Sequence, residues 1–437
     1  MEEKLIGSHY SRSKDNSGSI ILLTLIFPFA GLLYSLVRWR ESWAKNVFWL
    51  ACVYMGAVFV FFPEGTIFGQ GADGGRYAMW LQEMYNSNIT LSYIFSNFRV
   101  DSHIMDLYQP LLTYLVSRIT DNGHVLFAVF AFVFGFFYSR NIWYVLDRLP
   151  QKRLGNLVIL FALFFLICPI TQINGVRMWT ALHVFVYAIM PYLLERDKSK
   201  FWWVLITPFI HFSFLYVSLF AIAYFFLPYS LKTQSKAFLF LVLSFFIVSM
   251  FVNALNLSVV SDTLAEYSPE SYEDRITGYV NQDYADRIKE SASLSNWYVT
   301  LSGSISHWVY AILLIIAYPY VLKNCQNRKW MSHLYGFSLL IGGFANIMAF
   351  IPSGGRFRLL SQMFIVAFIL ILAMLVEKND VYRKCVNIAS VFLLLPLVFG
   401  LRGLLDYFSV TLIAGNFITM FFVENNTLLI DYLKYII

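Results

Sequence analysis

Apolar stretches long enough to cross a lipid bilayer recur along almost the whole chain of 437 residues. A hydrocarbon core about 30 Å thick needs about 20 apolar residues per helix, since every backbone amide inside it must be bonded within the protein. The stretches lie near residues 20–37, 46–62, 122–138, 156–171, 175–194, 201–228, 237–259, 299–321, 334–351, 359–376 and 385–403. With 59% hydrophobic and 13% charged residues, the composition excludes an ordinary soluble domain and predicts an all-α polytopic integral membrane protein.

Short loops rich in Lys and Arg set the predicted orientation. More than half of the 32 Lys and Arg residues lie in the short connections 38–45, 139–155, 195–200, 229–236, 322–333 and 377–384. Positive residues stay on the cytoplasmic side, so the large connections 64–121 and 260–297 are predicted to be extracytoplasmic, as is the tail 404–437. These loops account for the net charge of +6, and no nucleic acid is needed to explain it.

The stretch 201–228 departs from this alternation, because lysines flank it at both ends. Both ends should then be cytoplasmic, yet two full spans would need about 40 residues. We therefore predict a hairpin of two short helices, with Pro208, His211 and Ser213 at its apex. The alternative is one long tilted helix with one loop assignment reversed. Counting the hairpin as two helices gives about twelve transmembrane helices in a single domain, 1–437, with both termini outside.

Four separate stretches place ionisable side chains at the predicted extracytoplasmic face. They are GQGADGGRY with Asp73, Arg76 and Tyr77, the helix start with Arg177, the hairpin apex with His211, and GGRFR with Arg356 and Arg358. Charges within a membrane bundle point to function by default. Each arginine has a simpler alternative, that of an anchor reaching toward lipid headgroups.

The GGRFR segment has features of an anion site. Gly354 and Gly355 allow a ligand close to the backbone, and the helix that follows presents its positive end. Arginines bind phosphate or pyrophosphate through forked hydrogen bonds. His211 has a pKa that its surroundings can tune and could serve as a base, whereas His183 is expected to be a packing residue.

The string GQGADG at 69–74 fits the pattern G-x-G-x-x-G, but it follows a membrane helix and no βαβ unit surrounds it, so a dinucleotide site is excluded. Asp73 and Tyr77 stand four residues apart and share a face if Asp73 begins a helix. Asp101, His103 and Asp106 lie farther along the same loop and are further candidates, the alternative being the ordinary polarity of a solvated loop.

Several kinds of chemistry have no motif in this sequence. There is no P-loop, no G-x-S-x-G and no cysteine or histidine cluster with metal spacing, and the four cysteines show no pairing pattern. We expect no metal and no cofactor. The first 19 residues are polar, so the first apolar run is expected to be a membrane anchor and not a removable signal peptide. A substrate must then arrive already activated, carried on a lipid.

Two motifs carry a family resemblance. Asn174, Gly175, Val176 and Arg177 form an N-G-[IV]-R turn that opens a helix, and His211, Phe212 and Ser213 follow in the hairpin. Together they resemble the EpsG-like branch of the Wzy-type polysaccharide polymerases, which make O-antigen, capsule or exopolysaccharide. Asp73 with Tyr77 and the later Arg356 with Arg358 are similar to further parts of that pattern. Met178 departs from it, because many relatives carry Gln after the arginine.

The resemblance implies a glycosyltransferase of the bacterial inner membrane that works on its periplasmic side. Such enzymes join oligosaccharide repeat units carried on undecaprenyl pyrophosphate, with the lipid pyrophosphate as leaving group. A cationic clamp would stabilise that group, and a base would take the acceptor's proton. The residues implied are Arg177, Arg356, Arg358 and Arg76 for the pyrophosphate, His211 or Asp73 for the base, and Asn174, Gly175, Tyr77, Asp106 and Ser213 for the substrate.

Two alternatives remain open at this point. Another lipid-linked-sugar glycosyltransferase or a ligase would share the arginines and the acid. A flippase or transporter would usually show two related halves and a polar path through the bilayer, and neither is evident. The expected partners are the lipid-linked oligosaccharide and membrane lipid, with a chain-length regulator protein as a further partner to test.

Overall fold

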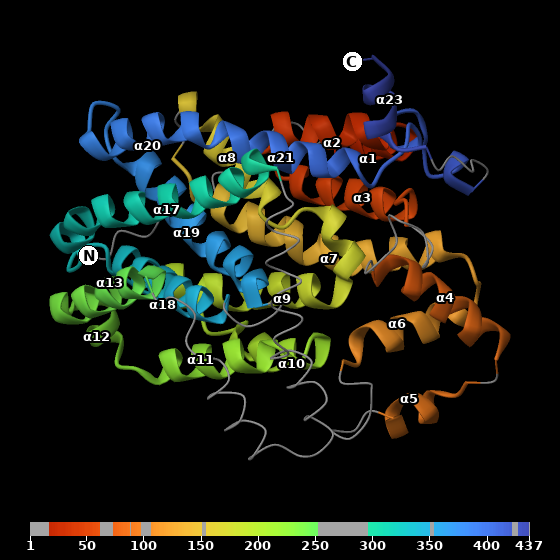
Figure 1. Cartoon of the computed structure of the whole chain (residues 1–437), viewed down its shortest axis with the longest axis horizontal. Coiled ribbons are helices and arrows are strands. Elements are labelled where there is room, and N and C mark those ends of the chain that lie inside the picture. The colour runs from red at the N-terminus through yellow and green to blue at the C-terminus, as the bar shows by residue number, and fades with distance from the viewer. Residues whose placement is uncertain are drawn as a thin grey trace.

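The computed structural model describes residues 17–61, 73–87, 89–97, 106–150, 154–251, 296–349, 354–421 and 427–436 (Figure 1). Within these ranges the secondary structure is helical, apart from two isolated β-bridges, Phe59–Phe408 and Ser409–Leu428. The predicted all-α class is therefore confirmed for the described part of the chain. The predicted outer loop 260–297 lies almost wholly outside the described residues.

The helices follow one another in chain order with short connections. They are α1 (Ser17–Ile26), α2 (Pro28–Val37), α3 (Ala44–Ala57), α4 (Asp73–Asn86), α5 (Leu91–Asn97), α6 (Tyr108–Ser117), α7 (Gly123–Leu146), η1 (Gly155–Leu157), α8 (Val158–Leu166), η2 (Ile170–Gly175), α9 (Val176–Glu195), η3 (Phe201–Leu205), α10 (Thr207–Ile210), α11 (Phe214–Phe226), α12 (Tyr229–Gln234), α13 (Lys236–Phe251), α17 (Trp297–Asn324), α18 (Lys329–Met348), η4 (Gly354–Arg356), α19 (Phe357–Leu375), α20 (Val381–Phe392), α21 (Leu394–Leu405), α22 (Thr411–Ala414), η5 (Thr419–Phe421) and α23 (Leu429–Ile436).

Four helical segments in the described ranges are long and apolar enough to cross a membrane. They are Gly123–Leu146, Gly155–Glu195, Trp297–Asn324 and Gly354–Leu375, and the bent pair α20–α21 would make a fifth. Other predicted spans form apolar helices of only 10–17 residues, which are shorter than a full crossing requires. The chain is thus a multi-pass membrane protein by these helices, and the count of about twelve spans stays a prediction.

Two apolar runs expected to be single helices are broken by proline, so that expectation was wrong. The run 20–37 divides at Phe27, and Pro28 occupies the first position of α2, where its missing N–H costs nothing. The run 385–403 bends by 49° between α20 and α21. Pro396 lies in the first turn after that bend, and it cannot donate to the carbonyl four residues earlier.

The predicted hairpin is present as two antiparallel arms, η3–α10 and α11. His211 ends the first arm in an extended conformation (φ −149°, ψ 120°), so one continuous helix is excluded. Phe201 at the start of the first arm packs on Phe225 at the end of the second, with ring centroids 4.2 Å apart. Nearer the apex, the hydroxyls of Thr207 and Ser218 are 2.9 Å apart. The apex therefore lies at the end opposite the lysine-flanked ends.

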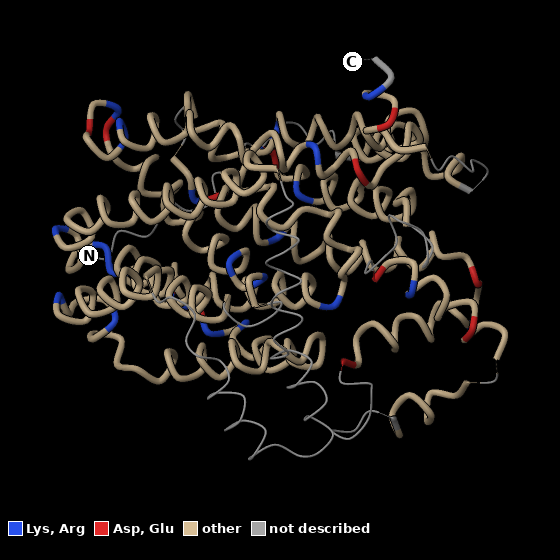
Figure 2. Tube along the Cα trace, viewed as in Figure 1, with Lys and Arg blue, Asp and Glu red and all other residues tan. Residues whose placement is uncertain are grey.

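The core lies around α7, α9, α18 and α19, whose facing side chains are buried. Helix α3 packs along α7, and α18 packs against both α13 and α19. The turns α12–α13, α17–α18 and α19–α20 meet at the left end of the bundle in Figure 2 and carry many of its blue residues. These turns are the predicted cytoplasmic loops 229–236, 322–333 and 377–384, and one end of the bundle gathers all three.

The two predicted extracytoplasmic segments that the structure describes are partly ordered. The connection 64–121 contains α4, α5 and α6. The segment after α21 returns to the N-terminal helices, since the amide of Val60 donates to the carbonyl of Tyr407 at 3.0 Å and Phe408 is fully buried. Helices α4 and α6 are the elements that bring acidic residues to the start of α9.

Candidate functional site

Arg177 lies in the first turn of α9 and is held by two side chains from the preceding large loop. One amino nitrogen, Nη1, donates to Asp106 Oδ2 at 3.1 Å, and Nε donates to the Tyr77 hydroxyl at 3.3 Å. The Arg177 side chain is 32% exposed and that of Asp106 only 7%. Within the described residues, Nη2 makes no hydrogen bond, so the guanidinium is fixed in orientation while one edge stays available to a ligand.

Asp106 joins this arginine to the hairpin. Its second oxygen, Oδ1, accepts the backbone N–H of Phe212 at 2.7 Å, and the next amide, that of Leu107, donates to the carbonyl of Phe209 at 2.9 Å. The carboxylate therefore ties together the start of α6, the start of α9 and the hairpin apex. Because it is buried and bonded through both oxygens, Asp106 positions other groups and is poorly placed to contact substrate itself.

We expect Asp106→Asn to lower the free energy of unfolding by about 2 kcal/mol. An amide offers only one acceptor atom, so either the Phe212 N–H or the Arg177 amino group would face another donor. Thermal unfolding of the purified protein in detergent measures the change. Asp431→Asn is the matched control, because its pair with Lys434 is exposed on both sides and should change the stability by less than about 0.5 kcal/mol. Equal effects of the two variants would contradict the tie.

His211 lies in the break between the hairpin arms, outside the segments long enough to span. Its Nδ1 accepts the backbone N–H of Ser213 at 3.2 Å and lies 2.8 Å from the Ser213 hydroxyl. A backbone amide can only donate, so Nδ1 carries no hydrogen and the neutral ring holds its proton on Nε2. Burial, together with the charges of Arg177 and Arg356, lowers the pKa of His211 to about 3. His211 is thus a neutral hydrogen-bond donor.

We expect the His211 imidazole to stay neutral between pH 5 and 8. NMR of ¹⁵N-histidine-labelled protein should show constant ring shifts for the signal that His211→Gln removes. Because the unfolded chain takes up this proton near pH 6.5 and the folded chain only near 3, acidification through that window should also reduce stability. A titration of the ring near pH 6.5 would contradict the burial of the charge between two arginines.

Helix α4 begins at Asp73, as the spacing of Asp73 and Tyr77 predicts. The side chain of Asn174 accepts the Gly74 N–H at 3.1 Å, which satisfies one of the amides left free at a helix start. A Cβ on Gly74 would lie 2.5 Å from that amide oxygen, so the contact requires glycine. Asp73 pairs with Arg76 three residues on, and the charge of Asp73 acts on Arg177.

The expected substrate contacts of Asn174, Tyr77 and Ser213 are used on protein groups in this structure. Asn174 holds α4, Tyr77 holds Arg177, and Ser213 bonds His211 and donates to Met178 Sδ at 3.7 Å. Gly175 precedes α9 and lies against the ring of Trp179. These residues shape the candidate site, which we call the Arg177 cluster: Asp73, Arg76, Tyr77, Asp106, Arg177, His211, Ser213 and Arg356.

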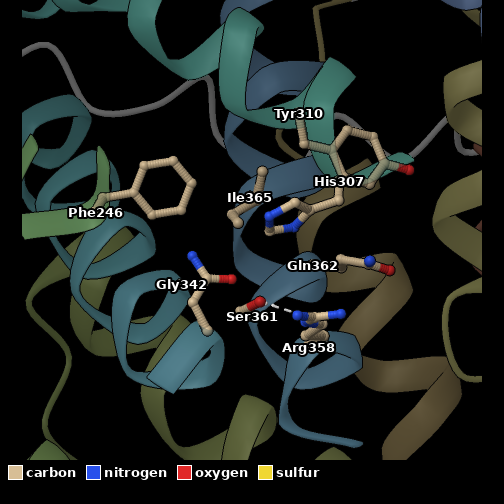
Figure 3. A pocket seen from close by; sticks show the side chains of 9 residues that line it. Phe246, His307, Tyr310, Gly342, Arg358, Ser361, Gln362 and Ile365 are labelled. Atoms are coloured by element: carbon tan, nitrogen blue, oxygen red, sulfur yellow. Dashed lines mark hydrogen bonds between the residues drawn. The ribbon is translucent and has the colours of Figure 1, made fainter. Parts of the chain in front are cut away.

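The structure separates Arg356 from Arg358. The Arg356 charge reaches His211, and its residue is exposed. Arg358 instead lines a hollow between α13, α17, α18 and α19 (Figure 3), and none of the residues that line it belongs to the Arg177 cluster. His307, on α17, lines the same hollow. The sequence offered a signal for it, since an ionisable residue inside an apolar run is unusual.

The remaining expectations concern packing and metals. His183 is fully buried, with Nε2 3.0 Å from the Cys168 carbonyl and the Asn141 amide donating to its own carbonyl, so its packing role is confirmed. The four cysteines are free. Within the described residues, no group of three His, Cys, Asp or Glu side chains could hold a metal ion.

The family resemblance is confirmed by comparison with known families. The model of the EpsG family matches residues 65–411, which is more than half of the chain and includes every residue of the Arg177 cluster. No curated protein and no solved structure matches the sequence. The match and the apolar helices together indicate a multi-pass membrane protein of polysaccharide biosynthesis.

Proposed function

The chain belongs to the EpsG family, and on that premise we propose that it polymerises oligosaccharide repeat units carried on undecaprenyl pyrophosphate. The observation that carries the proposal is Arg177, fixed by Asp106 and Tyr77 beside the neutral His211. A permanent cation held at the start of a buried helix, with one edge available, suits an anionic leaving group. The protein would act in the bacterial inner membrane with this cluster facing the periplasm.

The reaction moves the growing chain from its lipid to the next unit. A hydroxyl oxygen of the acceptor unit attacks the anomeric carbon of the donor chain, and the bond from that carbon to the pyrophosphate oxygen breaks. The electron pair leaves with the lipid pyrophosphate, and the hydroxyl proton passes to a base. Negative charge grows on the departing oxygen, where Arg177 and Arg356 would stabilise it by preorganised charge.

The geometry favours Asp73 over His211 as the base. His211 accepts at Nδ1 from Ser213 and holds its proton on Nε2, so it would donate a hydrogen bond to a phosphate oxygen. Asp106 has both oxygens engaged by Arg177 and Phe212. Asp73 is paired with Arg76, and its side chain is 23% exposed, which leaves a carboxylate lone pair for the acceptor's proton.

We expect the loop before α19 to face the periplasm. Gly355→Cys should react with a membrane-impermeant maleimide in intact spheroplasts, because Gly355 is exposed with open space around a Cβ. Lys198→Cys should react only after permeabilisation. Cys385, the one cysteine that is not buried, is first replaced by serine. Labelling of Lys198→Cys in intact spheroplasts would reverse the orientation.

Purified protein in proteoliposomes with synthetic lipid-pyrophosphate repeat units tests the function. We expect a ladder of products, each one repeat unit longer than the last, with one undecaprenyl pyrophosphate released per bond. Transfer to a different acceptor without a ladder would identify a ligase. Movement of intact units across the bilayer without new bonds would identify a flippase, and either result would overturn the proposal.

A further inference from the structure

A second polar hollow lies beside the first turns of α19. It encloses about 300 Å³ of empty space, part of which is open to the surroundings, and its polar lining includes Arg358, Gln362, His307 and Asn346. Figure 3 shows Arg358 and Gln362 on successive turns of α19 while His307 reaches in from α17. Phe246 and Tyr310 add aromatic walls. Nothing in the function proposed above requires this hollow.

The lining of the hollow favours an anion. Arg358 is a permanent cation in the first turn of α19, where the helix also presents its positive end. No carboxylate lines the hollow within the described ranges, and the Arg358 guanidinium makes no described hydrogen bond or ion pair. Asn346 is 4% exposed and fixed by donating to Ser249 Oγ at 3.0 Å. Arginine, imidazole and planar amides around one space suit a group with several oxygens, such as phosphate.

One helix start serves both places. Arg356 and Arg358 are two residues apart, and about 100° per residue sets them on nearly opposite sides of the α19 axis. Arg356 extends its charge to His211 in the Arg177 cluster, whereas Arg358 shares its hollow with His307. Each arginine is thus combined with a histidine from a different helix. The GGRFR segment therefore supplies two separate cationic positions at the same end of the bundle.

We infer that the hollow at Arg358 and His307 binds the pyrophosphate of the acceptor substrate. The inference rests on the proposed polymerase function, in which two lipid pyrophosphates are bound at once. The donor's pyrophosphate leaves and belongs at Arg177. The acceptor reacts through a hydroxyl and keeps its own pyrophosphate bound to its sugar, so that group needs a second anion site away from the reacting atoms. The Arg358 hollow holds the acceptor by its retained charge.

Binding stoichiometry tests the hollow without any turnover. Isothermal titration of the detergent-purified full chain with farnesyl pyrophosphate should give two sites for the wild type and one for Arg358→Gln or for Arg177→Gln. Arg402→Gln, an exposed arginine on α21, should keep two. Two sites remaining in Arg358→Gln would overturn the inference. If Arg358→Gln weakens phosphatidylglycerol binding and leaves farnesyl pyrophosphate unchanged, the hollow binds bulk lipid headgroups, which also overturns it.

Kinetics then assign the site to the acceptor. With a lipid-linked oligomer as donor, Arg358→Gln should raise KM for the lipid-linked repeat unit about 10-fold and leave kcat near the wild-type value. On a repeat unit capped by a methyl group in place of lipid pyrophosphate, the variant and the wild type should be equal. A lower kcat with unchanged KM would refute the assignment. If the wild type forms no polymer, the proposed function fails, whereas the binding count still decides whether the hollow takes pyrophosphate.

Discussion

The Arg177→Ala variant should insert normally into the membrane and extend chains at least about 10²-fold more slowly than the wild type. The residue holds a fixed cation at the start of α9 with Nη2 available, and the reaction needs positive charge where the lipid pyrophosphate departs. The rate of polymer formation in proteoliposomes measures the loss. Because Asp106 would keep its bond to the Phe212 amide, the fold should survive, and circular dichroism should match the wild type.

The identity of the cation at this position is tested by Arg177→Lys. A lysine retains the charge but cannot reach Asp106, Tyr77 and a phosphate oxygen from one planar group. We expect its rate to remain at least about 10-fold below that of the wild type, while Arg402→Ala on α21 keeps full activity. Polymer of normal length and rate from Arg177→Ala would remove the arginine from the mechanism, and full rescue by lysine would reduce its role to simple charge.

The Asp73→Asn variant should lose about 10²- to 10⁴-fold in the rate of chain extension, the usual contribution of a general base. His211→Gln should lose less than about 10-fold, because the Gln amide still supplies an N–H donor in place of the imidazole Nε2. Asp73→Glu keeps a carboxylate at the start of α4 and should restore part of the rate. Single-turnover assays with preloaded donor compare the three variants without interference from product release.

The reverse order of effects would exchange the two roles. If His211→Gln is the more damaging change and introduces an acidic limb near pH 6.5 in the remaining activity, the histidine is the base and its buried, neutral state is relieved when substrate binds. If all three variants retain normal rates, the cluster is structural and the chemistry lies elsewhere in the chain.

The sequence predicts the fold class and much of the site because both depend on local composition. Apolar runs show directly which segments enter the membrane, and an isolated Arg177 or His211 in such a run is conspicuous. Lysines at both ends of 201–228 were enough to predict the hairpin. Where proline interrupts a run, as at Pro28 and Pro396, the run still looks continuous by hydropathy, and the break follows from a missing backbone donor that composition does not register.

The partners of the site residues could not be predicted, since they depend on contacts across the fold. Asp106 is one of several acids in the loop 64–121, and nothing in its neighbourhood distinguishes it from Asp101. Its importance comes from a backbone amide 106 residues away. The division of Arg356 from Arg358 likewise requires the direction in which α19 faces its neighbours, because either arginine alone would satisfy the sequence pattern.

The bonds made by Asp106 also set an order of events during synthesis. This carboxylate leaves the ribosome 71 residues before Arg177 and 106 residues before the amide of Phe212. Until both arrive, the acid has neither of these partners and must remain hydrated, because an unpaired charge is costly in an apolar setting. The loop that carries it therefore cannot settle against the bundle until the hairpin has inserted, and a nascent chain that stops short of residue 212 would expose an unfinished, water-filled mouth.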